Sequence, residues 1–146
     1  MTDAQTTDQL NENDVVDAVC RYLKRSGYEI VQISHTRQQG DDIVAARAGE
    51  RLIVEAKGAT SARESSRRFG TAFSSAQIKV HVAETVYRAV QVLSRPMVNG
   101  EKVRAGIALP DNLLHRREID SVSIMLRKLE IVVFWVSDAD NATMNA

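Results

Sequence analysis

Six consecutive apolar residues at positions 131–136, IVVFWV, restrict the fold of this chain more than any other feature of its sequence. A strand with one solvated face alternates apolar and polar side chains, and this run does not alternate. An unbroken apolar strand is typical of a sheet that is covered on both faces. The run therefore predicts an α/β fold with helices on both sides of the sheet.

The rest of the chain alternates helix and strand patterns, each recognised by the spacing of its apolar residues. The order is helix, three strands, helix, strand, helix and strand, which predicts an antiparallel meander that feeds a mixed β-sheet flanked by helices. We expect one domain over residues 13–137, between flexible polar segments at 1–12 and 138–146. The expected helices are 13–26, 74–93 and 116–129, and the expected strands are 28–34, 43–46, 52–57, 103–109 and 131–136.

Composition narrows the classes of function. The chain of 146 residues carries 19 basic and 19 acidic side chains, so any surface that binds nucleic acid must be a local basic patch. Its single cysteine, Cys20, excludes an internal disulfide and fits a reducing cytoplasm. No apolar stretch approaches the ~20 residues of a membrane span, so we expect no membrane partner.

Two carboxylates and a lysine fall on neighbouring strands of the expected meander. Within the third strand, Glu55 and Lys57 point to one face, while Val54 and Ala56 point to the other. Asp42 begins the preceding strand, so a short turn would bring its carboxylate beside Glu55. Charged side chains in apolar strands are costly unless they are paired, hydrated or used.

Two converging carboxylates repel each other, and a divalent cation removes that repulsion. Oxygen ligands favour Mg²⁺, with Mn²⁺ as a substitute, and the sequence has no Cys/His cluster that would favour zinc. With Asp42 and Glu55 as metal ligands, Lys57 could orient an attacking water or stabilise the charge of a phosphoryl transition state. This set suits phosphodiester hydrolysis. A solvent-facing Glu–Lys pair is the structural alternative.

An aspartate followed by Glu-x-Lys on the next strand resembles the PD-(D/E)xK phosphodiesterase superfamily, the restriction-endonuclease-like nucleases. The order of helices and strands matches over residues 13–136. The resemblance implies that Asp42 and Glu55 bind the metal and that Lys57 is catalytic. Asp41 stands where the family has proline, which leaves open which aspartate is the ligand. We favour Asp42, because the apolar Ile43 follows it as in the family.

A polar stripe on the long helix offers further candidates. Gln77, His81, Glu84 and Arg88 share one side of this helix. Some relatives carry a glutamine at the start of this helix, so the resemblance suggests a catalytic Gln77, with His81 beside it. A solvated helix face with a Glu84–Arg88 pair is the alternative. Family members also use an early helix carboxylate, which suggests Glu12 over the nearby aspartates.

A loop at 58–70 follows the proposed site directly. Its arginines could contact phosphates, although such a run is also typical of a solvated surface. These arginines are Arg63, Arg67 and Arg68.

Together these features predict a metal-dependent nuclease that hydrolyses phosphodiester bonds, with DNA favoured over RNA by the resemblance alone. The pattern is compatible with a homodimer. The alternatives are a DNA-binding or assembly module that keeps the fold without cleaving, and a structural protein whose carboxylates only pair with Lys57.

Overall fold

The computed structural model of the chain describes residues 7–34, 40–60, 72–96 and 100–145. The strands are β1 (Glu29–Ile33), β2 (Ile43–Arg47), β3 (Glu50–Ala56), β4 (Lys102–Pro110), β5 (Val132–Asp138) and β6 (Asn141–Asn145). The helices are α1 (Glu12–Arg25), α2 (Ser75–Leu93), α3 (Leu113–Asp120) and α4 (Ser123–Lys128), and a 3₁₀ turn, η1 (Thr7–Gln9), precedes α1.

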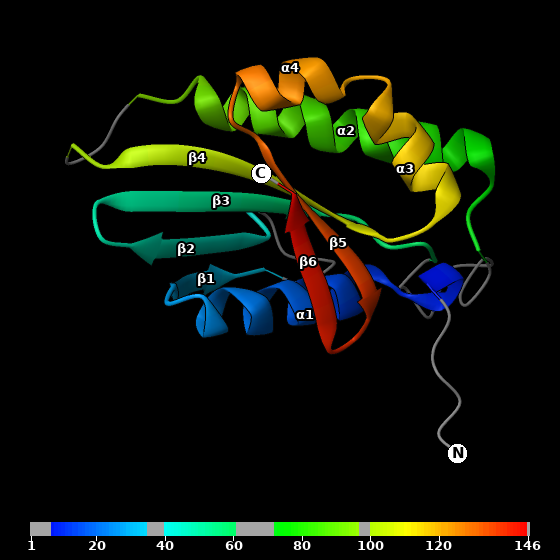
Figure 1. Ribbon diagram of the computed structural model, residues 1–146, viewed down its shortest axis with the longest axis horizontal. Helices are drawn as coiled ribbons and strands as arrows, with labels where there is room; N and C mark the ends of the chain where they lie inside the picture. The colour runs from blue at the N-terminus through cyan, green and yellow to red at the C-terminus, as the bar shows by residue number, and fades with distance from the viewer. Residues whose placement is uncertain (1–6, 35–39, 61–71, 97–99, 146) are drawn as a thin grey trace.

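The strands form one six-stranded mixed sheet in which they lie side by side in chain order, from β1 to β6. Figure 1 shows α1 on one side of the sheet and α2, α3 and α4 on the other. The predicted α/β class, the mixed sheet and the flanking helices are confirmed. Among the described residues, no helix combines the length and the apolar character needed to cross a bilayer.

The first three strands form the expected antiparallel meander. In the β2–β3 hairpin, Ile43 pairs with Val54 and Arg47 pairs with Glu50. Ala48 and Gly49 connect the two strands with positive φ angles of 26° and 77°. Two successive residues with positive φ make the tight turn whose twist matches the twist of the strands. The register of this hairpin decides which side chains meet at its open end.

The sheet continues through two parallel strands, since β3 pairs in parallel with β4 and β4 with β5. A sixth strand, β6, then pairs antiparallel with β5, with Trp135 opposite Thr143. We expected a flexible polar tail over 138–146, and a strand within it was not predicted. The hairpin turn is held by hydrogen bonds from Asp140 N–H and Asn141 Nδ2 to the Asp138 carboxylate.

The N-terminal segment also contains more structure than the sequence suggested. Leu10 is fully buried in the core on the α1 side of the sheet, although we expected residues 1–12 to be flexible. Its carbonyl oxygen accepts hydrogen bonds from the backbone N–H groups of Ala59 and Thr60. Asn11 caps α1 through a reciprocal pair of hydrogen bonds with Asp14. The start of α1 is therefore tied to the chain that follows β3.

One expected helix is divided in two. We predicted a single helix over 116–129, but α3 ends at Asp120 and α4 begins at Ser123. The hydroxyl groups of Ser121 and Ser123 donate to the carbonyl oxygens of Glu118 and Asp120. Serine side chains that hydrogen-bond to the local backbone compete with the regular helical pattern. This competition accounts for the break.

Candidate active site

The structure brings Asp42 and Glu55 together at the open end of the β2–β3 hairpin. Because Ile43 pairs with Val54, the preceding Asp42 lies beside the following Glu55. The backbone N–H of Ala56 donates to the Asp42 carboxylate at 2.8 Å. Burial raises the pKa of Asp42, and the Ala56 hydrogen bond opposes this shift. Burial, and then the neighbouring Asp42 charge, raise the pKa of Glu55 to about 7. The pair therefore binds protons more readily than isolated carboxylates do.

Asp41 has a different environment from its neighbour. Its carboxylate accepts two hydrogen bonds from Arg95, at 2.8 and 2.9 Å, and one from Arg88 at 3.2 Å. The hydrogen bond from Arg95 is the main cause of a lowered pKa at Asp41. Of the two aspartates left open by the sequence, Asp42 is the one that lies beside Glu55. Asp41 instead joins the start of β2 to the end of α2.

Lys57 lies on the same side of the sheet as Glu55, as the alternation along β3 predicted. Its ammonium group is 3.1 Å from a carboxylate oxygen of Glu84 on α2. Burial alone would lower the pKa of Lys57, but the hydrogen bond and charge of Glu84 raise it above its ordinary value. Lys57 is therefore a cation, held between the sheet and α2.

Glu84 and Arg88 were not predicted as site residues. Glu84 holds Lys57, and the Nε atom of Arg88 lies 3.9 Å from a carboxylate oxygen of Glu55. That Nε is buried and has no hydrogen-bond partner among the described residues. The polar stripe of α2 was the available signal. The alternative Glu84–Arg88 pair is not formed, because Glu84 contacts Lys57 and Arg88 contacts Asp41 and Glu55, although Glu84 itself stays largely exposed.

Glu12 lies near the same place because α1 begins against the end of β3. Gly58 makes this approach close: a Cβ added there would lie 2.5 Å from the carbonyl carbon of Asn11, and closer still to the backbone nitrogen of Glu12. The charge of Glu12 contributes to the raised pKa values of Glu55 and Lys57. The predicted early helix carboxylate is therefore within electrostatic reach of Glu55 and Lys57.

Gln77 and His81 occupy the first turns of α2. The Gln77 side chain accepts a hydrogen bond from Ser74 N–H at 2.8 Å and so completes a capping box. His81 packs edge-on against Phe73, with ring centres 4.5 Å apart. Burial, and then the charge of Lys57, lower the pKa of His81. His81 thus lies near Lys57, whereas Gln77 has a structural role in the helix cap.

Arg63, Arg67 and Arg68 lie outside the described residues. Within the described ranges, no three or more His, Cys, Asp or Glu side chains gather closely enough to hold a metal ion. Asp42 and Glu55 form a pair, with Glu12 contributing through its charge.

The fold and the site define an α/β protein with a half-buried carboxylate pair and a lysine on one face of its sheet. No protein-family model, curated protein or solved structure matches this chain.

Proposed function

We propose that this protein is a metal-dependent nuclease with a restriction-endonuclease-like fold, which hydrolyses phosphodiester bonds in DNA. The observation that carries the proposal is the convergence of Asp42 and Glu55 beside Lys57, at the end of a hairpin that follows a helix. Raised pKa values at both carboxylates support it, since such shifts concentrate at functional sites. The order of elements from α1 to β5 agrees with the resemblance of the motif.

The residues present fit a hard divalent cation. Asp42 and Glu55 supply carboxylate oxygens, which Mg²⁺ and Mn²⁺ prefer, and a bound cation would relieve the repulsion that helps to raise the pKa of Glu55. Glu12 is a third carboxylate, and its charge reaches Glu55. When bound, the metal would polarise a phosphoryl oxygen and acidify a water molecule.

The other side chains have separate roles in this proposal. Lys57 orients the attacking water or stabilises the negative charge that develops on the phosphoryl group. Glu84 keeps the ammonium group of Lys57 in place, and Arg88 offsets part of the charge of Glu55. Gln77 and His81 lie in the first turns of α2. Arg63, Arg67 and Arg68 contact DNA phosphates.

A cleavage assay with several DNA structures tests the proposed activity directly. Duplex, single-stranded, flap and four-way DNA are incubated with the protein and Mg²⁺ or Mn²⁺, and Asp42→Asn serves as the inactive control. We expect wild type to cut at least one substrate and the variant to cut none. Equal cutting by both proteins would indicate a contaminating nuclease. DNA binding without cleavage would favour the non-catalytic binding module.

Metal binding should depend on Asp42 and not on Asp41. We expect Mn²⁺ titration by calorimetry to show a site in wild type that is lost in Asp42→Asn and in Glu55→Gln. Asp41→Asn is the matched control, because it removes the adjacent carboxylate, which is engaged by Arg88 and Arg95. If binding were lost in Asp41→Asn and kept in Asp42→Asn, Asp41 would be the ligand and the assignment to Asp42 would be wrong. Bound Mn²⁺ should also raise the melting temperature of wild type by mass action.

Without metal, the stability of the fold should fall as the pH rises through the range in which Glu55 titrates. The pKa of Glu55 is raised from 4.5 to about 7 in the folded protein. Between these values the folded chain binds more protons than the unfolded chain, so the free energy of unfolding decreases with increasing pH. Glu55→Gln should remove this contribution.

Melting temperatures of the two proteins in EDTA, measured from pH 4.5 to pH 8 (roughly the window set by the Glu55 shift), check this expectation. The curves should lie closest at the acidic end, and Glu55→Gln should gain on wild type as the pH rises. Parallel curves over the whole range would show that the folded protein does not shift the titration of Glu55.

A further inference from the structure

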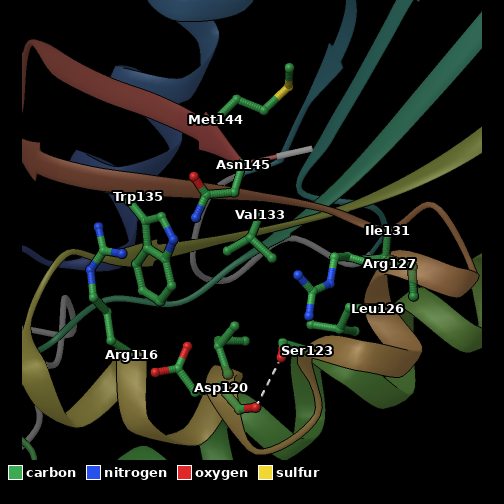
Figure 2. Close-up of a pocket in the computed structure, with 11 residues that line it drawn as sticks. Arg116, Asp120, Ser123, Leu126, Arg127, Ile131, Val133, Trp135, Met144 and Asn145 are labelled. Atoms are coloured by element: carbon green, nitrogen blue, oxygen red, sulfur yellow. Dashed lines mark hydrogen bonds between the residues drawn. The ribbon is translucent and has the colours of Figure 1, made fainter.

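A pocket of about 530 Å³ lies between α3 and α4 on one side and β5 and β6 on the other (Figure 2). It shares no lining residue with the candidate active site. Its volume falls within the range of pockets that bind small molecules, roughly 300–1,000 Å³.

The floor of this pocket is apolar. Four side chains from α3, α4 and the start of β5 form it, and each is at most 5% exposed: Ile119, Leu126, Ile131 and Val133. In Figure 2, Val133 lies at the centre of this floor, while the side chain of Met144 turns away from the pocket. Binding of a flat apolar ring on this floor would be favourable, because it removes apolar surface from water.

One wall of the pocket carries a hydrogen-bond donor without a partner. The indole Nε1 of Trp135 is buried and has no hydrogen-bond partner among the described residues. Figure 2 shows this nitrogen on the side of the ring that faces Val133. The guanidinium of Arg116 lies 4.5 Å from the centre of the Trp135 ring and also binds Asp111, so the ring is held in place. A buried unsatisfied donor is costly, and an acceptor on a bound molecule would remove that cost.

The opposite wall carries a cation. Arg127 on α4 lines the pocket, and Figure 2 shows its guanidinium turned toward the interior from the side opposite Trp135. Arg127 forms no salt bridge with another described residue, whereas Arg116 is paired with Asp111 and lies near Asp120. The free positive charge of this pocket is therefore at Arg127, where a planar guanidinium suits a carboxylate.

We propose that this pocket binds a small aromatic carboxylate that has a second oxygen acceptor at its far end. The ring lies on the apolar floor, the carboxylate pairs with Arg127, and the second oxygen accepts the indole N–H of Trp135. This assignment is independent of the nuclease proposal, because the two sites have no residue in common.

Trp135 is the only tryptophan in the chain, so its indole N–H gives a single signal in a nitrogen–proton correlation spectrum. The probe is 6-hydroxy-2-naphthoate, titrated into ¹⁵N-labelled full-length protein, with calorimetry of the same titration. We expect a saturable downfield shift of the indole proton. Absence of a saturable shift up to millimolar probe would overturn the proposal.

Two comparisons test the assigned contacts. Arg127→Ala should weaken binding about tenfold or more, because it removes a charge-assisted hydrogen bond. Lys128→Ala, the adjacent residue that does not line the pocket, removes the same charge and should leave the affinity unchanged. Equal losses in the two variants would assign the effect to general electrostatics and overturn the proposal.

If Arg127→Ala does not fold, wild type alone still tests the carboxylate contact. The neutral analogue 2-naphthol should bind at least about tenfold more weakly than the hydroxynaphthoate. Equal affinity for the two probes would show that no cation recognises the carboxylate.

Discussion

Replacing Lys57 with alanine should slow DNA cleavage by ~10²–10³-fold while DNA and metal affinity stay nearly unchanged. Its ammonium group lies on the same sheet face as Glu55, where it can act on the attacking water or on the developing phosphoryl charge. Neither role is needed to hold DNA in the ground state. Single-turnover cleavage with Mg²⁺, together with DNA affinity measured in Ca²⁺, separates the two effects.

Lys102→Ala is the matched control, because that lysine is largely exposed and pairs with Glu130. It should cleave at the rate of wild type. Lys57→Arg should restore little activity, since a planar guanidinium does not replace a compact ammonium group. If Lys57→Ala cuts as fast as wild type, the assignment of this strand as catalytic is wrong.

Gly58→Ala should produce a large loss of stability, about 3 kcal/mol, because the new Cβ would overlap backbone atoms of Asn11 and Glu12. Backbone cannot move aside as a flexible side chain can, so the start of α1 must shift away from β3. Thermal unfolding should show a melting temperature lower by roughly 10 °C. The same shift would move Glu12 away from Glu55, so Mn²⁺ affinity should fall as well.

Gly49→Ala provides the comparison for this variant. Gly49 has a positive φ of 77°, but no heavy atom lies within 4 Å of an added Cβ. Its substitution should cost only the strain of the left-handed conformation, about 1 kcal/mol. Equal stability of the two variants would show that the contact between Gly58 and α1 is not tight.

Much of the fold could be predicted because its signals are local. The apolar run of β5 and the alternation in β3 each depend on a few neighbouring residues. β6 was missed because Asn141–Asn145 has no apolar periodicity and buries only Ala142. This strand pairs with the edge that β5 offers, and Arg21 of α1 contacts the Asp140 carboxylate at the turn. Such contacts join distant parts of the chain and leave no local pattern.

Strand alternation and hairpin pairing were enough to predict the part of the candidate site that consists of Asp42, Glu55 and Lys57. The contributions of α2 depend on how that helix is rotated about its axis. On α2, the side chain of Thr85 is fully buried among the apolar positions of the helix. Its hydroxyl donates to the Val82 carbonyl oxygen at 2.7 Å, so burial leaves no donor unpaired. In the observed orientation of α2, Glu84 reaches Lys57 and Arg88 reaches Glu55.

Because Gly58 packs closely against the start of α1, far away in the sequence, we expect the site to be completed late in folding. The meander joins strands that are close in the sequence, so it can form early with little loss of chain entropy. Glu12 and Gly58 are 46 residues apart, and their contact requires closure of a long loop. A chain with a complete meander but an undocked α1 would hold Asp42 and Glu55 without the Glu12 charge. Proper metal affinity would then distinguish finished molecules from partly folded ones.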